Sequence, residues 1–447
     1  MSFISIKFFI FITIFLLLYK LFEKNSTYQK SIIILGSYIF YCMFKPYYAV
    51  ILLVVSAFNW AVSRILFTNK NRPLLIGSIA VNVALLSSFK YIAPLSIIMP
   101  IGLSFYIFEA ISLLVDAYKG KLDKSYSLTD ILLYLSFFPI LVSGPIMKAH
   151  EFLPQLKEKH SISLSSFEYG IQRFLLGAFE KVVIADRLSV AVDAVYSSPA
   201  AYSGISLLWN SITYTLQLFF DFAGYTNMAI AIATIIGFNV KENFNLPYIA
   251  SSPSDFWKRW HISLSSWITE YIYIPLGGNR KGVAKTLFNI MIAMTISGLW
   301  HGSTLNFLVW GLFHGLIQVI QKMAKELFPN KKKSSFAIFI DIILTFATVN
   351  FLWIPFRTDN LSMTILVLKR IFTNAVGLTY IYSYTLIFGI VLVAVEIYAI
   401  LRNNGNNPIH PVNLRTFKGK LVFATLFILT LMLAYFGNGA FIYGAKF

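Results

Sequence analysis

The sequence predicts an all-α polytopic membrane protein, and three observations lead to that class. The chain has 447 residues, of which 57% are hydrophobic and only 13% are charged. A soluble protein of this length could not bury so much apolar surface. The apolar residues gather in runs close to the length of about 20 residues that one membrane crossing needs. Basic residues gather in the short segments between those runs.

The apolar runs define the expected helices. Residues 1–20 contain Lys7 and an apolar run but no small-x-small cleavage site after it, so the first helix is expected to be retained. Several runs are short or close together and must be re-entrant or paired, which leaves roughly eleven to thirteen true crossings. The runs cover residues 3–22, 31–44, 47–67, 73–89, 95–117, 128–146, 170–195, 204–220, 222–238, 284–300, 302–321, 336–356, 361–376, 380–401 and 419–436.

The charge of the chain points to a membrane and not to nucleic acid. The net charge is +18, from 37 Lys and Arg against 19 Asp and Glu. Basic residues cluster at 64–72, 119–124, 322–333 and 415–420, which is the positive-inside pattern, so these loops are expected to face the cytoplasm. Nucleic acid is not an expected partner because no recognition module accompanies the charge. Cys42 is the only cysteine, which leaves no thiolate metal site, and no metal is expected.

The longest polar interruption of the apolar pattern runs from 241 to 282. Ser252 is a good N-cap and Pro253 suits the first helical position, so one helix is expected to start there and to end before Pro275. Polar and apolar residues alternate at helical spacing, so this helix is expected to lie along the membrane interface. The polar stripe holds Asp255, Arg259, Ser263, Ser266 and Glu270, and the apolar stripe holds Phe256, Trp260, Leu264, Trp267 and Tyr271.

Three histidines fall in or beside this region. His301 lies in an apolar run, where a polar group is costly unless it faces the bundle interior or a cavity, so it serves either a buried hydrogen bond or a function. His261 lies about 200° around the expected helix from Arg259, and a structural role is as plausible as a functional one. His314 would lie about 220° from His301 on a continuous helix, so the two are not expected to share a face. Small-xxx-small pairs surround these histidines and predict close helix packing: Gly298 with Gly302, and Gly311 with Gly315.

Two segments carry a resemblance to a known family: "FWKRWHISLSSWITEYIYIPLGGNR" (256–280) and "SGLWHG" (297–302). They are similar to the membrane-bound O-acyltransferases, in particular the bacterial branch with alginate and peptidoglycan O-acetyltransferases. Further agreement lies in "MPIGLSFYIFEAISLLVDAYKG" (99–120), "FFPILVSGPI" (137–146) and the stretch 214–248. The resemblance implies a single domain (1–447) of tilted helices around a central tunnel. Its parts would be N-terminal helices (1–94), a catalytic core (95–321) and C-terminal helices (322–447).

The resemblance also implies residue roles. It places the active-site histidine at His301 and a second characteristic histidine at His261. A hydroxyl needs a base to attack a thioester, and histidine, with an ordinary pKa near 6.5, typically supplies about 10²–10⁴-fold as that base. We assign this role to His301, and to His261 the orientation of substrate or the stabilisation of the oxyanion. The chain departs from the family's usual residues at four positions: Glu180, Asn227, Thr269 and Glu270.

The donor implied by the resemblance is acetyl-CoA, with no cofactor bound by the protein itself. Four basic residues are candidates to hold its phosphates, with simple positive-inside anchoring as the alternative: Lys258, Arg259, Arg280 and Lys281. Three further residues are expected to line the tunnel: Trp257, Trp300 and Asn245.

The implied reaction begins at the bacterial inner membrane, which a multi-pass chain would span. The acetyl group would pass to an extracytoplasmic transferase of the SGNH/GDSL type and then to a polysaccharide, with peptidoglycan ahead of alginate-like or cellulose-like polymers. D-alanyl transfer to teichoic acid is the alternative reaction. A transporter or flippase is the alternative class, and Asp221 and Glu109 within apolar segments would be its natural features.

Overall fold

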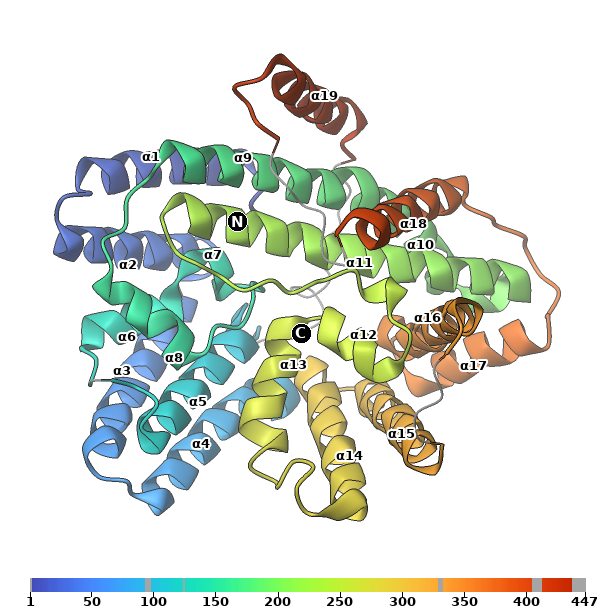
Figure 1. Cartoon of the computed structure of the whole chain (residues 1–447), viewed down its shortest axis with the longest axis horizontal. Helices are drawn as coiled ribbons and strands as arrows, with labels where there is room; N and C mark the ends of the chain where they lie inside the picture. The colour runs from blue at the N-terminus through green and yellow to red at the C-terminus, as the bar shows by residue number, and fades with distance from the viewer. Residues whose placement is uncertain (1, 93–97, 124, 329–332, 404–411, 436–447) are drawn as a thin grey trace.

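The computed structural model confirms the all-α class (Figure 1). It describes the whole chain except residues 1, 93–97, 124, 329–332, 404–411 and 436–447. Within the described residues the β-structure is limited to two isolated bridges. In the part of the chain that the structure describes, six helices are long and apolar enough to cross a membrane, namely those at Pro46–Thr68, Arg72–Ile92, Gly204–Ile235, Gly282–His301, Leu305–Leu327 and Ser335–Arg357.

Two of the N-terminal helices, α3 and α4, pack against one almost wholly buried helix, α5. Gly102, with a φ of 81°, precedes α5, and a Cβ there would lie 2.1 Å from the carbonyl oxygen of Leu141, so the close approach of these two segments requires glycine. The elements of this part are α1 (Ile6–Leu21), α2 (Ser26–Cys42), α3 (Pro46–Thr68), α4 (Arg72–Ser87), the π-turn η1 (Ser88–Ile92) and α5 (Leu103–Lys119).

Three of the expected spans in the central part of the chain differ from the helices that the structure shows. The expected span 128–146 breaks at Phe137, because Pro139 lacks the N–H that a continuing helix would need. The expected spans 204–220 and 222–238 are one helix of 32 residues, α11 (Gly204–Ile235). Asp221 interrupts the apolar pattern without ending this helix, because the ammonium of Lys181 lies 2.5 Å from its carboxylate.

The remaining elements before and beside α11 are short or continuous with one another. α9, η3 and α10 follow one another without a break and pack along α11 (Figure 1). They are α6 (Leu128–Ser136), α7 (Phe138–Leu141), α8 (Ala149–Phe152), η2 (Leu153–Lys157), α9 (Leu164–Phe179), η3 (Glu180–Ala185), α10 (Asp186–Ser197), η4 (Pro199–Ala201) and η5 (Pro247–Ile249).

The polar segment is not the single helix that its stripes predict. It forms α12 (Pro253–Arg259), α13 (Ile262–Ile268) and the π-turn η6 (Thr269–Tyr273). The expected start is confirmed, since Ser252 accepts a hydrogen bond from the Asp255 N–H at 3.3 Å. The helix breaks at Trp260, which is extended, and at His261, whose φ is +44°. The two stripes therefore end at the break, and the polar faces of α12 and α13 do not continue one another.

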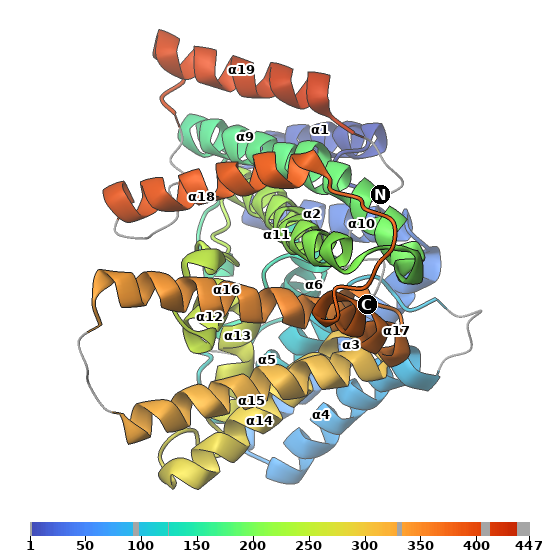
Figure 2. The ribbon, with the colours of Figure 1, turned by 90° about the vertical axis from the view of Figure 1, so that its right-hand side faces the viewer.

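The last part of the chain contains the long helices that close the bundle. In Figure 1, α12 and α13 lie below α11, with α5 on one side and α14 to α16 on the other. Figure 2 shows α14 and α15 running side by side. The bounds are α14 (Gly282–His301), α15 (Leu305–Leu327), α16 (Ser335–Arg357), α17 (Leu361–Phe372), α18 (Ser383–Asn403) and α19 (Phe417–Leu433).

Candidate active site

The close packing of α14 on α15 fixes the position of His301. A Cβ on Gly298 would lie 2.3 Å from the carbonyl oxygen of Phe307 and 3.1 Å from the Cα of Gly311. No side chain fits there, so the packing role predicted for these glycines is confirmed. α14 then ends at His301, and Gly302 starts the turn into α15. His301 is therefore the last residue of a helix whose end is held rigidly against its neighbour.

The imidazole of His301 lies inside the bundle among aromatic rings. Its residue is 1% exposed, as expected for a costly polar group in an apolar run. Ring centroids close to it include those of Trp300 at 4.9 Å, Trp310 at 5.0 Å, Phe356 at 5.3 Å and His261 at 6.5 Å. Aromatic walls of this kind exclude water and strengthen the electrostatic effect of any charge that forms beside them.

His261 reaches the same site from the break between α12 and α13. Its left-handed backbone, an uncommon conformation in which histidine is enriched, turns its ring toward Phe222 at 4.8 Å and Trp300 at 6.1 Å. Burial lowers the pKa of His261 to about 3, so the ring is neutral at physiological pH. The structure thus brings together the two histidines that the sequence singled out.

His314 also belongs to this neighbourhood, contrary to expectation. The expected separation from His301 assumed one continuous helix, but α14 ends at His301 and the chain turns before α15. The indole N–H of Trp257 donates to His314 Nδ1 at 3.3 Å, which assigns the ring proton to Nε2. The ring of Trp310 contacts both histidines, with its centroid 4.7 Å from that of His314 and 5.0 Å from that of His301.

A cavity of about 250 Å³ leads along α14 toward this group. Ser297 is the lining residue farthest along α14, one helical turn before His301. Of the three predicted tunnel residues, only Trp257 is in its wall, because Trp300 donates to the Ser104 carbonyl at 3.3 Å and Asn245 pairs with the backbone of Arg259. The lining residues are Trp257, Leu264, Ser265, Ile268, Thr269, Tyr273, Ile290, Ala293, Met294, Ser297 and Gln318.

The four predicted phosphate-binding residues occupy different settings. Arg259 is engaged within the fold, with its Nε 3.1 Å from Asp255 and its Nη1 3.2 Å from the Asn245 carbonyl. Lys258 is exposed and follows the cavity residue Trp257. Arg280 and Lys281 are exposed just before α14. A helix of this length separates them from His301 by about 30 Å at 1.5 Å per residue.

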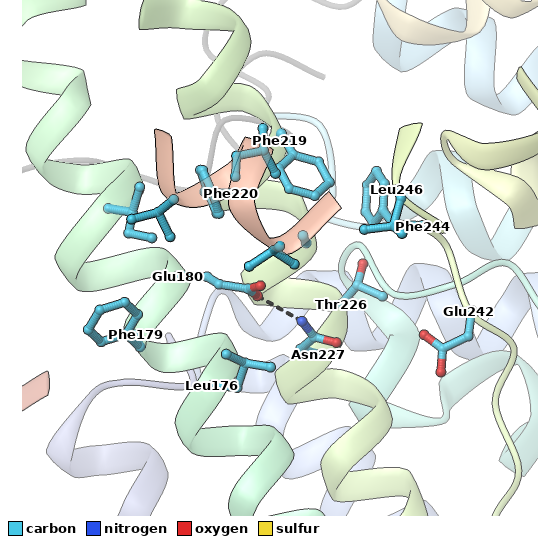
Figure 3. A pocket seen from close by; sticks show the side chains of 15 residues that line it. Leu176, Phe179, Glu180, Phe219, Phe220, Thr226, Asn227, Glu242, Phe244 and Leu246 are labelled. Carbon is cyan, nitrogen blue, oxygen red and sulfur yellow. Dashed lines mark hydrogen bonds between the residues drawn. The ribbon is translucent and has the colours of Figure 1, made fainter. Parts of the chain in front are cut away.

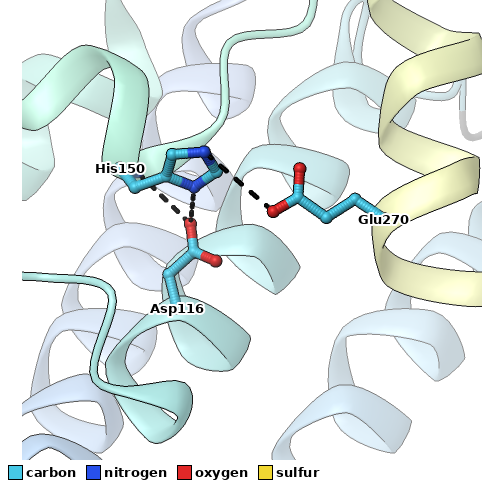
Figure 4. Close-up of side chains that lie close together, drawn as sticks. All are labelled: Asp116, His150 and Glu270. Atoms are coloured by element: carbon cyan, nitrogen blue, oxygen red, sulfur yellow. Dashed lines mark hydrogen bonds and ion pairs between the residues drawn. The ribbon is translucent and has the colours of Figure 1, made fainter. Parts of the chain in front are cut away.

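A charged cluster lies on the other side of α13, where Asp116 of α5, His150 of α8 and Glu270 of η6 meet (Figure 4). His150 Nδ1 is 2.8 Å from Asp116, whose carboxylate also accepts from the hydroxyl of Tyr271 at 2.9 Å. Burial alone would raise the pKa of Glu270, but hydrogen bonds from Lys121 and Lys148 outweigh it and lower that pKa to about 2.

These three side chains present ligand atoms within 4.8 Å of one another, which is compact enough to hold a metal ion. The two lysine ammoniums already contact the two oxygens of Glu270, and Lys148 lies 2.5 Å from one of them. The positive charge that a metal would supply is therefore present in the side chains themselves.

A second cavity, of about 360 Å³, lies between α9, η3, α11 and α18 (Figure 3). Its wall is largely apolar, but the Glu180 carboxylate points into it and accepts from Asn227 at 2.7 Å. These are two of the positions at which the chain departs from the family's usual residues, and they bond to each other. Phe244 is in this wall and packs on Phe222, which in turn covers His261, so aromatic side chains separate the cavity from the histidines.

Several site residues carry no sequence signal that would have identified them. Trp310, Trp353 and Phe356 build the aromatic wall, but tryptophan and phenylalanine are common in any membrane helix. Ser297 is one of many serines, although its spacing from His301 could have placed both on one face of α14.

Comparison with known proteins identifies the family of this chain. The sequence profile of the membrane-bound O-acyltransferase family matches residues 25–356. A protein of Pseudomonas fluorescens named "Probable alginate O-acetylase" is 35% identical over 79% of this chain and 72% of its own length. A peptidoglycan O-acetyltransferase of Helicobacter pylori is 32% identical over 78% of this chain and 74% of its own. A teichoic acid D-alanyltransferase of Bacillus subtilis is 28% identical over 58% and 68%.

Proposed function

Because the chain belongs to the membrane-bound O-acyltransferase family and is a multi-pass membrane O-acyltransferase, we propose a specific reaction for it. It takes an acetyl group from cytoplasmic acetyl-CoA at the bacterial inner membrane and delivers it for O-acetylation of an extracytoplasmic polysaccharide, first of all peptidoglycan. The observation that carries this proposal is the buried His301–His261 pair one helical turn beyond a cavity residue.

The two histidines divide the chemistry. A nitrogen of His301 accepts the proton of the attacking hydroxyl as its oxygen bonds to the thioester carbonyl carbon, and then returns it to the leaving sulfur. His261 faces the same space and is neutral, so one ring nitrogen carries an N–H that orients the substrate or stabilises the oxyanion. The aromatic wall keeps water, which would hydrolyse the thioester, away from the reacting atoms.

The cavity suits the slender arm of the donor. Its wall is mainly apolar between α13 and α14, and a few hydroxyl and amide groups on it can orient an amide-containing chain. Lys258, Arg280 and Lys281 are exposed and free to meet the phosphates of CoA on the cytoplasmic side. Arg259 is the weakest of the four candidates, because Asp255 and Asn245 already engage its guanidinium.

Delivery of the acetyl group to the polysaccharide requires a partner protein. The relatives named for alginate and for peptidoglycan match at similar identity, 35% and 32%, so identity does not select the polymer. The abundance of lysine, asparagine, isoleucine and phenylalanine suggests an AT-rich genome, which favours peptidoglycan over alginate. We expect an SGNH/GDSL-type transferase outside the membrane to receive the acetyl group. D-alanyl transfer is the second candidate, supported by the teichoic acid relative at 28% identity.

The test uses the purified full chain in lipid vesicles with labelled acetyl-CoA, the partner transferase and peptidoglycan fragments. We expect release of CoA and appearance of base-labile acetate on the fragments. Replacing acetyl-CoA by a D-alanyl donor distinguishes the second candidate. A protein that moves a substrate across the vesicle membrane and consumes neither acyl donor would overturn the proposal and support a transporter.

A further inference from the structure

The end of α14 depends on side chains from another part of the chain. A helix leaves its last four carbonyls without partners inside the helix, and in α14 these belong to residues 298–301. The carbonyl of Leu299 accepts a hydrogen bond from the hydroxyl of Tyr91 at 2.7 Å. The next carbonyl, that of Trp300, accepts from the ammonium of Lys90. Two consecutive residues of η1 therefore hold two consecutive carbonyls in the last turn of α14.

Lys90 extends in an unusual direction for its position. It lies near the end of the apolar segment Arg72–Ile92. A lysine near the end of a membrane helix normally extends its ammonium to the membrane surface. Lys90 is instead partly buried, and within the ranges that the structure describes its ammonium is bonded to the Trp300 carbonyl and to no carboxylate. The side chain of Lys90 therefore serves the end of α14.

A cation is favourable at this end of α14. The C-terminal end of a helix carries roughly half a unit of negative charge, which basic side chains in the last turn can offset. His301 is the basic residue in the last turn of α14, but a base must be uncharged before it accepts a proton. Lys90 supplies a permanent cation from a different helix, so His301 is not needed for that purpose.

These contacts act on the residue whose position matters most for the reaction. His301 directly follows Trp300, so the bond from Lys90 holds the peptide group that joins these two residues. Gly298 fixes α14 against α15, but the final turn of a helix frays more easily than its interior. A displacement of about 1 Å in a catalytic group can cost about 10²-fold in rate. The contacts of Lys90 and Tyr91 therefore bear on the rate more than on the stability of the fold.

We propose that Lys90, assisted by Tyr91, is a positioning residue for His301, an inference that rests on the proposed function. The two hydrogen bonds keep the last turn of α14 in place while the imidazole takes up the proton of the attacking hydroxyl and returns it to the leaving sulfur. Neither side chain has to touch the substrate for this role. The donor cavity lies between α13 and α14, and neither residue is in its wall. Loss of Lys90 should therefore lower kcat and leave the KM for acetyl-CoA unchanged.

The experiment measures acetyl transfer by the purified full chain in lipid vesicles, with the partner transferase and peptidoglycan fragments, over a range of concentrations of labelled acetyl-CoA. Lys90→Met removes the ammonium from a side chain of similar length, and we expect kcat to fall by about 10-fold or more at an unchanged KM. The melting temperature should stay close to that of wild type, because one hydrogen bond and one charge in apolar surroundings are lost together. Lys90→Arg can still donate to the carbonyl and should recover most of kcat.

Two further variants complete the set. Tyr91→Phe should lower kcat by less than Lys90→Met, because it removes one uncharged hydrogen bond to α14. Ser88→Ala is the matched control. The hydroxyl of Ser88 bonds the Leu85 carbonyl at 2.8 Å, so this variant alters the same turn and removes no bond to α14. Its kcat should match that of wild type.

The outcomes separate this inference from the proposed function. A wild-type kcat in folded Lys90→Met would overturn the positioning role and leave the O-acetyltransferase intact. An equal loss in Lys90→Met, Lys90→Arg and Ser88→Ala would also contradict it and indicate a structural role for the whole turn. If Lys90→Met does not fold, Tyr91→Phe decides, and a wild-type kcat in that variant would overturn the proposal. A wild type that consumes no acetyl-CoA even with its partner would overturn the proposed function itself.

Discussion

Two of the histidine clusters in the described part of the chain, those around His301 and His150, are built on opposite principles. Around His301 the neighbours are aromatic and imidazole rings, at centroid distances of 4.9–6.5 Å. Around His150 the neighbours are carboxylates, with Asp116 at 2.8 Å, Glu151 at 3.7 Å and Glu270 at 4.0 Å. His150 is also 26% exposed in its side chain, whereas His301 is 1% exposed as a residue.

The difference shows how the fold keeps a histidine assigned to the reaction apart from a histidine that stabilises the structure. A histidine tied to carboxylates in a network with lysines is held in place, and its interactions join α5, α8 and η6. A histidine buried mainly among aromatic rings costs stability and yields a base in a dry site one helical turn beyond a cavity residue. The comparison predicts that removing the imidazole of His301 reduces turnover, whereas removing side chains of the charged cluster around His150 reduces stability.

The largest effect is expected on folding, from a change at the contact between α14 and α15 that positions His301. Gly298→Leu should leave little folded protein, because the new side chain would start 2.3 Å from the Phe307 carbonyl and force α14 from α15. Gly77→Leu in α4 is the matched control, since a Cβ there has no atom within 4 Å. Gel filtration of both variants measures the folded fraction. Equal recovery of the two would show that α14 and α15 do not pack as described.

His261→Asn should lower acetyl transfer by about 10-fold, less than the loss of a general base. Asparagine tolerates the left-handed backbone at this position, so the variant removes the imidazole without straining the chain. The measurement is acetyl transfer from labelled acetyl-CoA, normalised to folded protein. Transfer at the wild-type rate would remove His261 from the chemistry and leave it as packing for Phe222 and Trp300.

His314→Ala should affect stability more than turnover. It leaves the Trp257 N–H without its acceptor in a buried site, at a cost of about 1–3 kcal/mol. Trp310, which packs against both His314 and His301, stays in place, so the reacting atoms keep most of their surroundings. We expect a lower melting temperature and transfer within a few-fold of wild type. A loss as large as that of His261→Asn, in protein of normal melting temperature, would place His314 in the reaction.

The smallest effect on turnover is expected in the charged cluster. The pKa of Glu270 is depressed from about 4.5 to about 2, so its ionised form stabilises the fold above its unfolded pKa, and that contribution is lost as the pH falls toward 2. The melting temperature of wild type should fall between about pH 5 and pH 3. The melting temperature of Glu270→Gln should be lower than that of wild type at neutral pH and should change less over that window. Its rate of acetyl transfer should be close to that of wild type. Parallel pH profiles of the two proteins would contradict this account.

The sequence predicted those features that depend on local chemistry. Ser252 and Pro253 start a helix, the glycines at 298 and 311 pack two helices, and His301 is buried, because each follows from a residue type and its immediate spacing. The break at His261 was missed because helical stripes run through it on both sides. The continuity of α11 was missed because the partner of Asp221 lies on η3.

The arrangement of side chains around the candidate active site could not be predicted without the structure. The sequence named His301 and His261 by resemblance, but it could not show that a turn brings His314 beside them or that α15 and α16 supply the aromatic wall. Nor could it show which tryptophan faces the cavity, since Trp257 and Trp300 look alike in the chain and only Trp257 is in the wall. Such contacts depend on how segments far apart in sequence meet.

The most direct test compares the two histidines in one assay, by acetyl transfer from labelled acetyl-CoA in membranes, normalised to folded protein. His301→Ala should remain folded, because it removes a buried polar group, and should lose at least about 10²-fold in rate. His150→Ala should recover in lower yield and keep most of its rate per folded molecule. Equal rates for the two variants, or a full rate in His301→Ala, would contradict the division between a reacting histidine and a supporting one.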